Sequence, residues 1–192
     1  MKKKMNLKDI LVPAVMLLVI CLVTTVLLAL TNSVTKTKIA QNAADKETSS
    51  RAEVLPEATQ FSEVTTDEEK GVSYCEGKNA DGESVGYVFT SSAKGYGGDV
   101  TVMTGVGADG KITGVTILSH GETPGLGANS TKPEFRNRFI GKGGELVVNK
   151  TSNDGQNVQA ITAATITSKA VVAAVNDALS VFSEVTGGAE NG

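Results

Sequence analysis

Residues 10–31 form an uninterrupted run of 22 residues without a charged side chain. As an α-helix this run is about 33 Å long, enough to cross a hydrocarbon core of about 30 Å. A cleaved signal peptide is the alternative, but its apolar core usually has only about 7–15 residues. No clean small-x-small cleavage site follows the run. We therefore predict an uncleaved transmembrane helix at 10–31.

Basic side chains are unevenly distributed around this run. Four lysines lie within residues 1–9, whereas two lie within 32–38. Because an excess of basic residues marks the cytoplasmic flank of a membrane helix, residues 1–9 are predicted to be cytoplasmic. The chain then crosses the lipid of the cell membrane once, and everything after the helix lies on the extracytoplasmic side.

The composition beyond the membrane helix excludes several classes of function. The net charge of the whole chain is −3, and without residues 1–35 it is −6, so binding to a nucleic-acid backbone is not expected. Two cysteines without a Cys-x-x-Cys pair and one histidine do not make a zinc or iron–sulfur site. A Ser-His-Asp arrangement would depend on His120 alone. Any redox role therefore needs a cofactor that thiolates do not hold.

The rest of the chain predicts a polar juxtamembrane segment at 32–60, a folded domain at 61–187 and a tail at 188–192. The juxtamembrane segment is expected to be helical as far as about Arg51. The dipeptides Asp81-Gly82 and Asp109-Gly110 each separate two strand-like stretches and predict two hairpins. These hairpins join residues 72–75 with 85–90, and residues 100–106 with 112–118.

Three further elements complete the predicted domain. Residues 133–140 suggest a short helix with Phe135, Phe139 and Ile140 on one face, and residues 146–148 suggest a brief strand. Apolar residues recur every three or four positions from 168 to 185, which indicates an amphipathic helix that ends at Gly187-Gly188. The fold class is therefore α+β, with an antiparallel-rich sheet, a C-terminal packing helix and one membrane helix.

Two segments carry candidate chemistry. The first, residues 161–168, has four hydroxyl side chains in seven residues just before the last helix. One hydroxyl suffices to cap a helix, whereas small residues and the free N–H groups of a helix start also favour a bound phosphate. The second, residues 121–128, is either a surface turn or a loop whose Leu126 covers a flat apolar group; alternatively, Leu126 caps the core.

The segment Thr162-Ala163-Ala164-Thr165 resembles the flavin-attachment motif Asp-x-x-Ser/Thr-Gly-Ala-Thr of the FMN-binding domain family. Residues 95–98, the second hairpin and residues 122–127 occur in the same order in that family, after a single N-terminal membrane helix. The similarity covers residues 5–185. Within the family it is to the G subunits of Rnf electron-transport complexes, to which the C subunits of sodium-translocating NADH:quinone reductases are related.

This resemblance implies FMN joined through its phosphate to Thr165 by a phosphoester bond, which a flavin transferase makes outside the cytoplasm from FAD. Thr165 would anchor the cofactor and would not act as a base or nucleophile in turnover. Thr167 best suits a plain N-cap. The other cofactor-binding residues implied are Thr162, Ala163, Ala164, Thr167, Lys169, Glu122, Thr123, Gly125, Leu126 and Gly127. Two residues depart from the motif, since Gln159 replaces its Asp and Ala163 replaces its Gly.

The implied function is that of a membrane-anchored flavoprotein subunit, which relays electrons within an ion-translocating ferredoxin:NAD⁺ oxidoreductase. Other membrane and iron–sulfur subunits would hold the remaining cofactors, because this chain has no ligands for them. Two alternatives stay open from the residues alone. The domain is a noncovalent binding module for FMN or another phosphate ligand, or it is a stand-alone extracellular flavin-dependent reductase.

Overall fold

The computed structural model describes residues 7–187. The first three lysines of the predicted cytoplasmic end and the predicted tail at 188–192 lie outside these residues. The chain divides into two compact units, one that ends at Asp45 and one that begins at Lys46.

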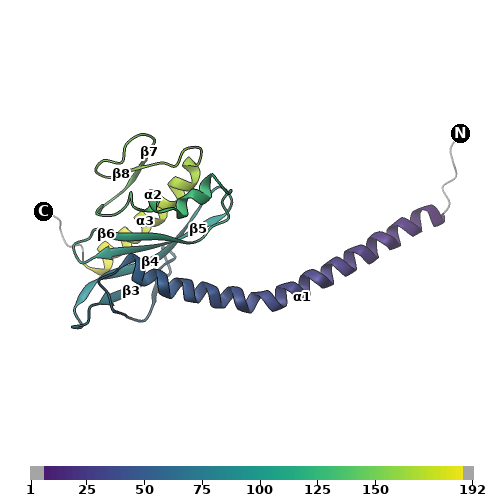
Figure 1. Cartoon of the computed structure of the whole chain (residues 1–192), viewed down its shortest axis with the longest axis horizontal. Coiled ribbons are helices and arrows are strands. Elements are labelled where there is room, and N and C mark those ends of the chain that lie inside the picture. Colours follow the sequence, from purple (N-terminus) through teal and green to yellow (C-terminus); the bar gives the residue numbers. More distant parts are fainter. Residues whose placement is uncertain (1–6, 188–192) are drawn as a thin grey trace. The chain divides into compact units, whose positions relative to one another are not determined.

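Helix α1 runs from Leu7 to Val54 (Figure 1). Its described residues as far as Asp45 belong to the first unit, and its residues from Lys46 onward belong to the second. Over the described residues, α1 is the one helix long and apolar enough to cross a membrane. The large apolar side chains from Ile10 to Leu30 are all exposed, as expected for side chains that face lipid. No break separates the predicted membrane helix from the predicted juxtamembrane segment, because α1 is continuous as far as Val54.

The second unit is built on an antiparallel sheet. Its strands pair in the order β1-β3-β4-β5-β6, and β2 also pairs with β3. The strands are β1 (Gln60–Phe61), β2 (Thr65–Asp67), β3 (Val72–Lys78), β4 (Ser84–Lys94), β5 (Asp99–Gly107) and β6 (Ile112–Ser119). Both predicted hairpins are confirmed, as β3–β4 and β5–β6. Gly82 and Gly110 have positive φ angles in the two turns, which explains their place in the sequence.

Helix α3 (Thr165–Val185) packs across this sheet (Figure 1). The elements between the sheet and α3 are η1 (Gly127–Thr131), α2 (Pro133–Arg136), β7 (Val147–Asn149) and β8 (Asn157–Gln159). Strand β8 pairs in parallel with β7 and was not predicted. The short helix is also shorter than predicted, and Ile140 does not share the buried face of Phe135 and Phe139, because half of Ile140 is exposed.

Each face of the sheet has its own apolar core, because residues alternate between the faces along each strand. On one face, strand residues pack against the apolar side of α3. These residues include Phe89, Val100, Val102 and Val106 from the sheet, and Val171, Val175, Leu179 and Phe182 from α3. On the other face the end of α1 and the following turn cover a smaller core. It consists of Val54, Leu55, Ala58, Cys75, Val88 and Met103.

Two paired glycines allow the end of α1 to lie directly on the sheet. Gly105 and Gly114 face each other across β5 and β6, and a Cβ on Gly105 would lie 2.1 Å from the Val54 carbonyl oxygen. Thr113 Oγ1 donates a hydrogen bond of 2.5 Å to the same carbonyl, and Lys46 Nζ donates to the Ile117 carbonyl. The folded unit therefore includes residues 46–60, which the sequence assigned to the juxtamembrane segment.

Candidate functional site: a pocket at the start of α3

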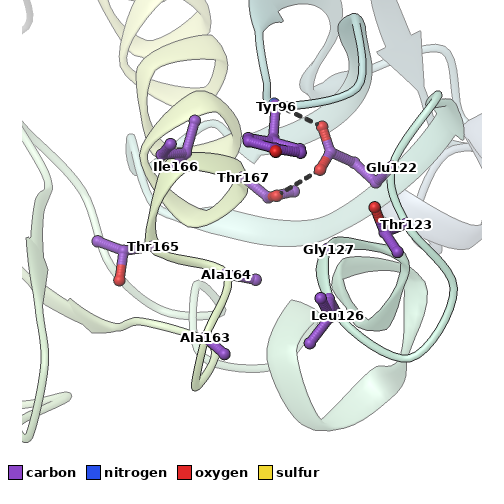
Figure 2. Close-up of a pocket in the computed structure, with 10 residues that line it drawn as sticks. All are labelled: Tyr96, Glu122, Thr123, Leu126, Gly127, Ala163, Ala164, Thr165, Ile166 and Thr167. Carbon is purple, nitrogen blue, oxygen red and sulfur yellow. Dashed lines mark hydrogen bonds between the residues drawn. The ribbon is translucent and has the colours of Figure 1, made fainter.

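A pocket of about 560 Å³ lies where the first turn of α3 meets two glycine-containing loops. The first loop is the β4–β5 turn at residues 95–98, and the second follows β6 at residues 121–127. Figure 2 shows the residues that line the pocket. They are Tyr96, Glu122, Thr123, Leu126, Gly127, Ala163, Ala164, Thr165, Ile166 and Thr167.

The structure brings together most of the residues that sequence reasoning nominated for cofactor binding. Eight of them line the pocket, although they come from segments about 40 residues apart. Three do not: Thr162 and Lys169 are exposed outside it, and Gly125 forms the tip of the loop with a φ of +80°. Both predicted segments therefore reach the pocket, and the individual cofactor contacts stay predictions.

Sequence reasoning missed Tyr96 and Ile166, which also line the pocket. Tyr96 is 74% exposed and Ile166 is 55% exposed, and Leu126 beside them is 42% exposed. Large apolar side chains this exposed around one pocket are typical of a surface that binds an apolar group. The sequence did contain an indication that Tyr96 is exposed for binding. It is a single aromatic residue inside the run Gly95–Gly98, where no neighbouring side chain is available to pack against it.

Glu122 holds the three segments of the pocket together. Its Oε1 atom accepts hydrogen bonds from the backbone N–H groups of Tyr96 at 2.8 Å and Gly97 at 3.1 Å. Its Oε2 atom accepts a bond of 2.6 Å from Thr167 Oγ1 (Figure 2). Glu122 is only 6% exposed. A single carboxylate thus links the β4–β5 turn, the 121–127 loop and the first turn of α3.

The surroundings of Glu122 leave no room for larger residues. A Cβ on Gly127 would lie 2.3 Å from Glu122 Oε2 and 2.5 Å from Thr167 Oγ1. Burial acts to raise the pKa of the Glu122 carboxyl. The hydrogen bonds from Thr167, Gly97 and Tyr96 and the nearby His120 outweigh burial, so this pKa lies below its ordinary value. The carboxylate is therefore ionised at neutral pH.

The start of α3 differs from the prediction. Thr167 is not the N-cap residue: α3 begins at Thr165, Ala164 is its N-cap, and no side chain caps the helix there. Thr167 is instead in the first turn, 1% exposed, and its hydroxyl donates to Glu122. Ser168 N donates to the Ala164 carbonyl, whereas the amides of Thr165, Ile166 and Thr167 have no backbone partner within residues 7–187. All three of these residues line the pocket.

Ser168 fixes the turn that precedes α3. Its fully buried hydroxyl accepts a hydrogen bond of 2.9 Å from Ile161 N and donates one of 2.9 Å to the Ala164 carbonyl. Inside this turn Ala163 has a φ of +59°, the one positive φ among the non-glycine residues of 7–187. Glycine adopts this conformation without steric cost, and the motif that this segment resembles has glycine at this position.

We expect the change Ala163→Gly to raise the free energy of unfolding by up to about 1 kcal/mol. Relief of a left-handed conformation yields about 1–2 kcal/mol, and the greater freedom of glycine in the unfolded chain offsets about 0.5–1 kcal/mol of this. Thermal melting of the full chain in detergent measures the effect. The control Ala160→Gly, at a position without a positive φ, is expected to lower stability. A lower melting temperature for Ala163→Gly would contradict the account.

Three polar or reactive side chains outside the pocket have supporting or structural roles. His120 Nδ1 accepts a hydrogen bond of 3.2 Å from Glu122 N, so it supports the 121–127 loop without lining the pocket. Arg138 donates to the Gln159 carbonyl at 2.5 Å and holds the strand that leads into the Thr162–Thr165 segment. Cys75 is buried in the core beneath α1. Within residues 7–187 no group of three or more metal-binding side chains occurs.

Comparisons with known proteins agree with this geometry. The FMN-binding domain model matches residues 95–180, a range that contains every residue lining the pocket. A model of the RnfG N-terminal region matches residues 1–54. The G subunit of the Na⁺-translocating ferredoxin:NAD⁺ oxidoreductase complex of Acetobacterium woodii is 41% identical over 88% of this chain and 90% of that protein. The chain belongs to the RnfG family.

One further relative and one solved structure are also similar to this chain. The G subunit of the ion-translocating oxidoreductase complex of Methanosarcina acetivorans is 37% identical over 94% of this chain and 98% of that protein. Among solved structures, the C subunit of the Na⁺-translocating NADH-quinone reductase from Parabacteroides distasonis is 30% identical, with a TM-score of 0.51. That match spans 62% of this chain and 65% of the solved chain, just under two thirds of it. The predicted fold class and family resemblance are confirmed.

Proposed function

We propose that this chain carries FMN covalently on Thr165 and relays electrons within an Rnf-type ion-translocating ferredoxin:NAD⁺ oxidoreductase complex. The observation that carries the proposal is the pocket at the start of α3. It combines unpaired backbone amides, a threonine at the first position of the helix and exposed apolar side chains. Membership of the RnfG family and the FMN-binding domain match support the same conclusion.

The pocket suits the chemistry of FMN. Its volume lies within the roughly 300–1,000 Å³ typical of small-molecule sites. The uncapped N-terminus of α3 favours a phosphate, through its free N–H groups and the positive end of the helix dipole. Leu126, Tyr96 and Ile166 offer apolar surface for a flat ring. When bound, FMN supplies the redox chemistry, and the protein positions it and tunes its electrostatics.

Three threonines compete as the attachment residue, and their surroundings favour Thr165. Thr162 is exposed and lies outside the pocket. Thr167 is buried, and its hydroxyl is already bonded to Glu122. Thr165 is half-buried, lines the pocket and occupies the first position of α3, and within the described residues its hydroxyl has no hydrogen-bond partner. It therefore combines access with a free hydroxyl beside the phosphate site.

The proposed partners follow from the relatives, which are named as G subunits of oxidoreductase complexes. The other membrane and iron–sulfur subunits of the complex would supply the ferredoxin, NAD and iron–sulfur sites. A flavin transferase would attach the cofactor on the extracytoplasmic side, and α1 would hold the domain at the lipid bilayer. The domains assigned from the sequence, with the flavin domain extracytoplasmic, are part of this proposal.

Denaturation tests the proposal directly. The full chain is expressed with and without a flavin transferase and run on a denaturing gel under ultraviolet light. Covalent flavin gives a fluorescent band at the position of the chain only with the transferase. A chain that purifies with FMN but loses it in the gel would be a noncovalent binding module. Purification without other Rnf subunits from its native membrane would favour the stand-alone reductase.

The change Leu126→Asp is expected to alter the absorbance spectrum of the bound flavin while the stability of the domain changes by less than about 0.5 kcal/mol. The small stability effect follows from the exposure of Leu126, because substitutions at exposed positions cost little. Absorbance spectra and thermal melting of the same preparation measure the two effects. A loss of about 2–5 kcal/mol without a spectral change would mean that Leu126 caps the core.

The orientation of α1 gives a further expected result. In intact cells stripped of wall, added protease should remove the domain after α1, while a tag before Lys2 stays protected until the membrane is permeabilised. The reason is the excess of lysines within residues 1–9. Immunoblots against the tag and against the C-terminus follow both ends. A domain that resists protease until permeabilisation would reverse the assigned orientation.

A further inference from the structure

The wall of the pocket contains a negative charge without a compensating ion pair. Glu122 lines the pocket, and none of the ion pairs formed within residues 7–187 includes it. The bonds of its two oxygens come from two backbone amides and one hydroxyl, which are neutral groups. Neutral donors stabilise an ionised carboxylate without cancelling its net charge.

The surroundings allow this charge to act on a molecule in the pocket. Glu122 is nearly fully buried, so little water lies between its carboxylate and the pocket interior. The interaction of two charges is several times stronger near a protein interior than in bulk water. Two basic side chains lie near in sequence, Lys169 on the exposed side of α3 and His120, whose Nδ1 accepts a hydrogen bond from Glu122 N. Neither of them lines the pocket, and neither forms an ion pair with Glu122 within residues 7–187.

We propose that the Glu122 carboxylate lowers the reduction potential of the flavin held in this pocket. The inference rests on the proposed function, because it requires FMN at the site. When the flavin takes up two electrons and one proton, it gains one net negative charge. A fixed negative charge in the pocket wall opposes that gain, and it therefore favours the oxidised flavin. The three hydrogen bonds of Glu122 hold the charge in place, which makes it a fixed electrostatic element.

Redox titration of charge variants tests this inference on the full flavinylated chain in detergent. The neutral variants are Glu122→Gln and Glu122→Met, the second of which keeps a similar volume. Glu122→Asp keeps the charge. The control Glu184→Gln removes a carboxylate near the other end of α3, about 25 Å along the helix from Thr167. This separation exceeds the Debye length of about 10 Å at 0.1 M salt. Each protein is titrated anaerobically with dithionite against a reference dye, and the flavin absorbance gives the midpoint potential.

Removal of the Glu122 charge is expected to increase the equilibrium constant for flavin reduction at least tenfold. For a two-electron couple this corresponds to a midpoint potential about 30 mV higher. Glu122→Asp and Glu184→Gln should stay close to wild type. Equal potentials for wild type and a neutral variant would overturn the inference, as would an Asp variant that shifts as far as Gln. If neither neutral variant retains flavin, Glu122 is needed to hold the pocket in shape for the cofactor, and the inference is overturned. Absence of flavin from wild type on the denaturing gel would instead defeat the proposed function.

Discussion

The change Thr165→Ala is expected to abolish covalent flavin completely while the domain still folds. Thr165 would supply the oxygen of the phosphoester bond, and alanine has no oxygen to replace it. The fold should survive because Thr165 is only half-buried and alanine is a good helix former. In-gel fluorescence of the variant made with the transferase measures attachment, and thermal melting measures folding.

Two matched variants control for general effects on the segment. Thr162→Ala removes a hydroxyl three residues earlier, outside the pocket, and should keep full fluorescence. Thr167→Val removes the hydroxyl that donates to Glu122; it should still accept flavin, with lower stability. Fluorescence that persists in Thr165→Ala and disappears in Thr162→Ala would move the attachment to Thr162.

Glu122→Ala is expected to lower the free energy of unfolding by about 2–4 kcal/mol at neutral pH. A hydrogen bond to a charged group contributes about 1.5–3 kcal/mol, and Glu122 accepts three, although the part-buried amides of Tyr96 and Gly97 can regain water. The Thr167 hydroxyl, being buried, has no such compensation. Chemical denaturation of the full chain measures the loss. A change below about 0.5 kcal/mol would contradict the role of Glu122 in joining the three segments.

The same contribution should depend on pH. Because the folded-state pKa of Glu122 is lowered, its stabilising effect is present above the unfolded pKa of about 4.3 and is lost as the pH falls through the folded value. The difference between wild type and Glu122→Ala should therefore be full at about pH 6 and smaller below about pH 4. A double-mutant cycle with Thr167→Val is expected to show a coupling of about 0.5–3 kcal/mol. A difference that grows with acidification would contradict this assignment.

Local patterns in the sequence were sufficient for much of the fold. The turn residues Asp81-Gly82 and Asp109-Gly110 defined both hairpins, and the apolar spacing after Ser168 defined most of α3. The prediction was weaker where a few residues decide the structure. Strand β8 has three residues, too few for a periodic pattern, and it exists because β7 pairs with it. Ile140 follows the helical spacing, but α2 ends at Arg136, so this spacing no longer applies.

The site could be predicted as two segments but not as a network. Residues 122–127 and 162–167 were both nominated, yet nothing local shows that Glu122 and Thr167 meet across 45 residues of chain. Thr167 was mistaken for a cap because hydroxyl residues before a helix usually have that role. A buried carboxylate with three donors arises from tertiary packing, and its position is set by the β4–β5 turn and α3 together.

The most direct test of the attachment site is mass spectrometry of the tryptic peptide 151–169 from wild type made with an active transferase. We predict that its mass increases by FMN minus one water, and that fragment ions place the added group on Thr165. An unmodified peptide, or fragment ions that place the group on Thr162 or Thr167, would contradict the assignment of Thr165 as the flavin anchor.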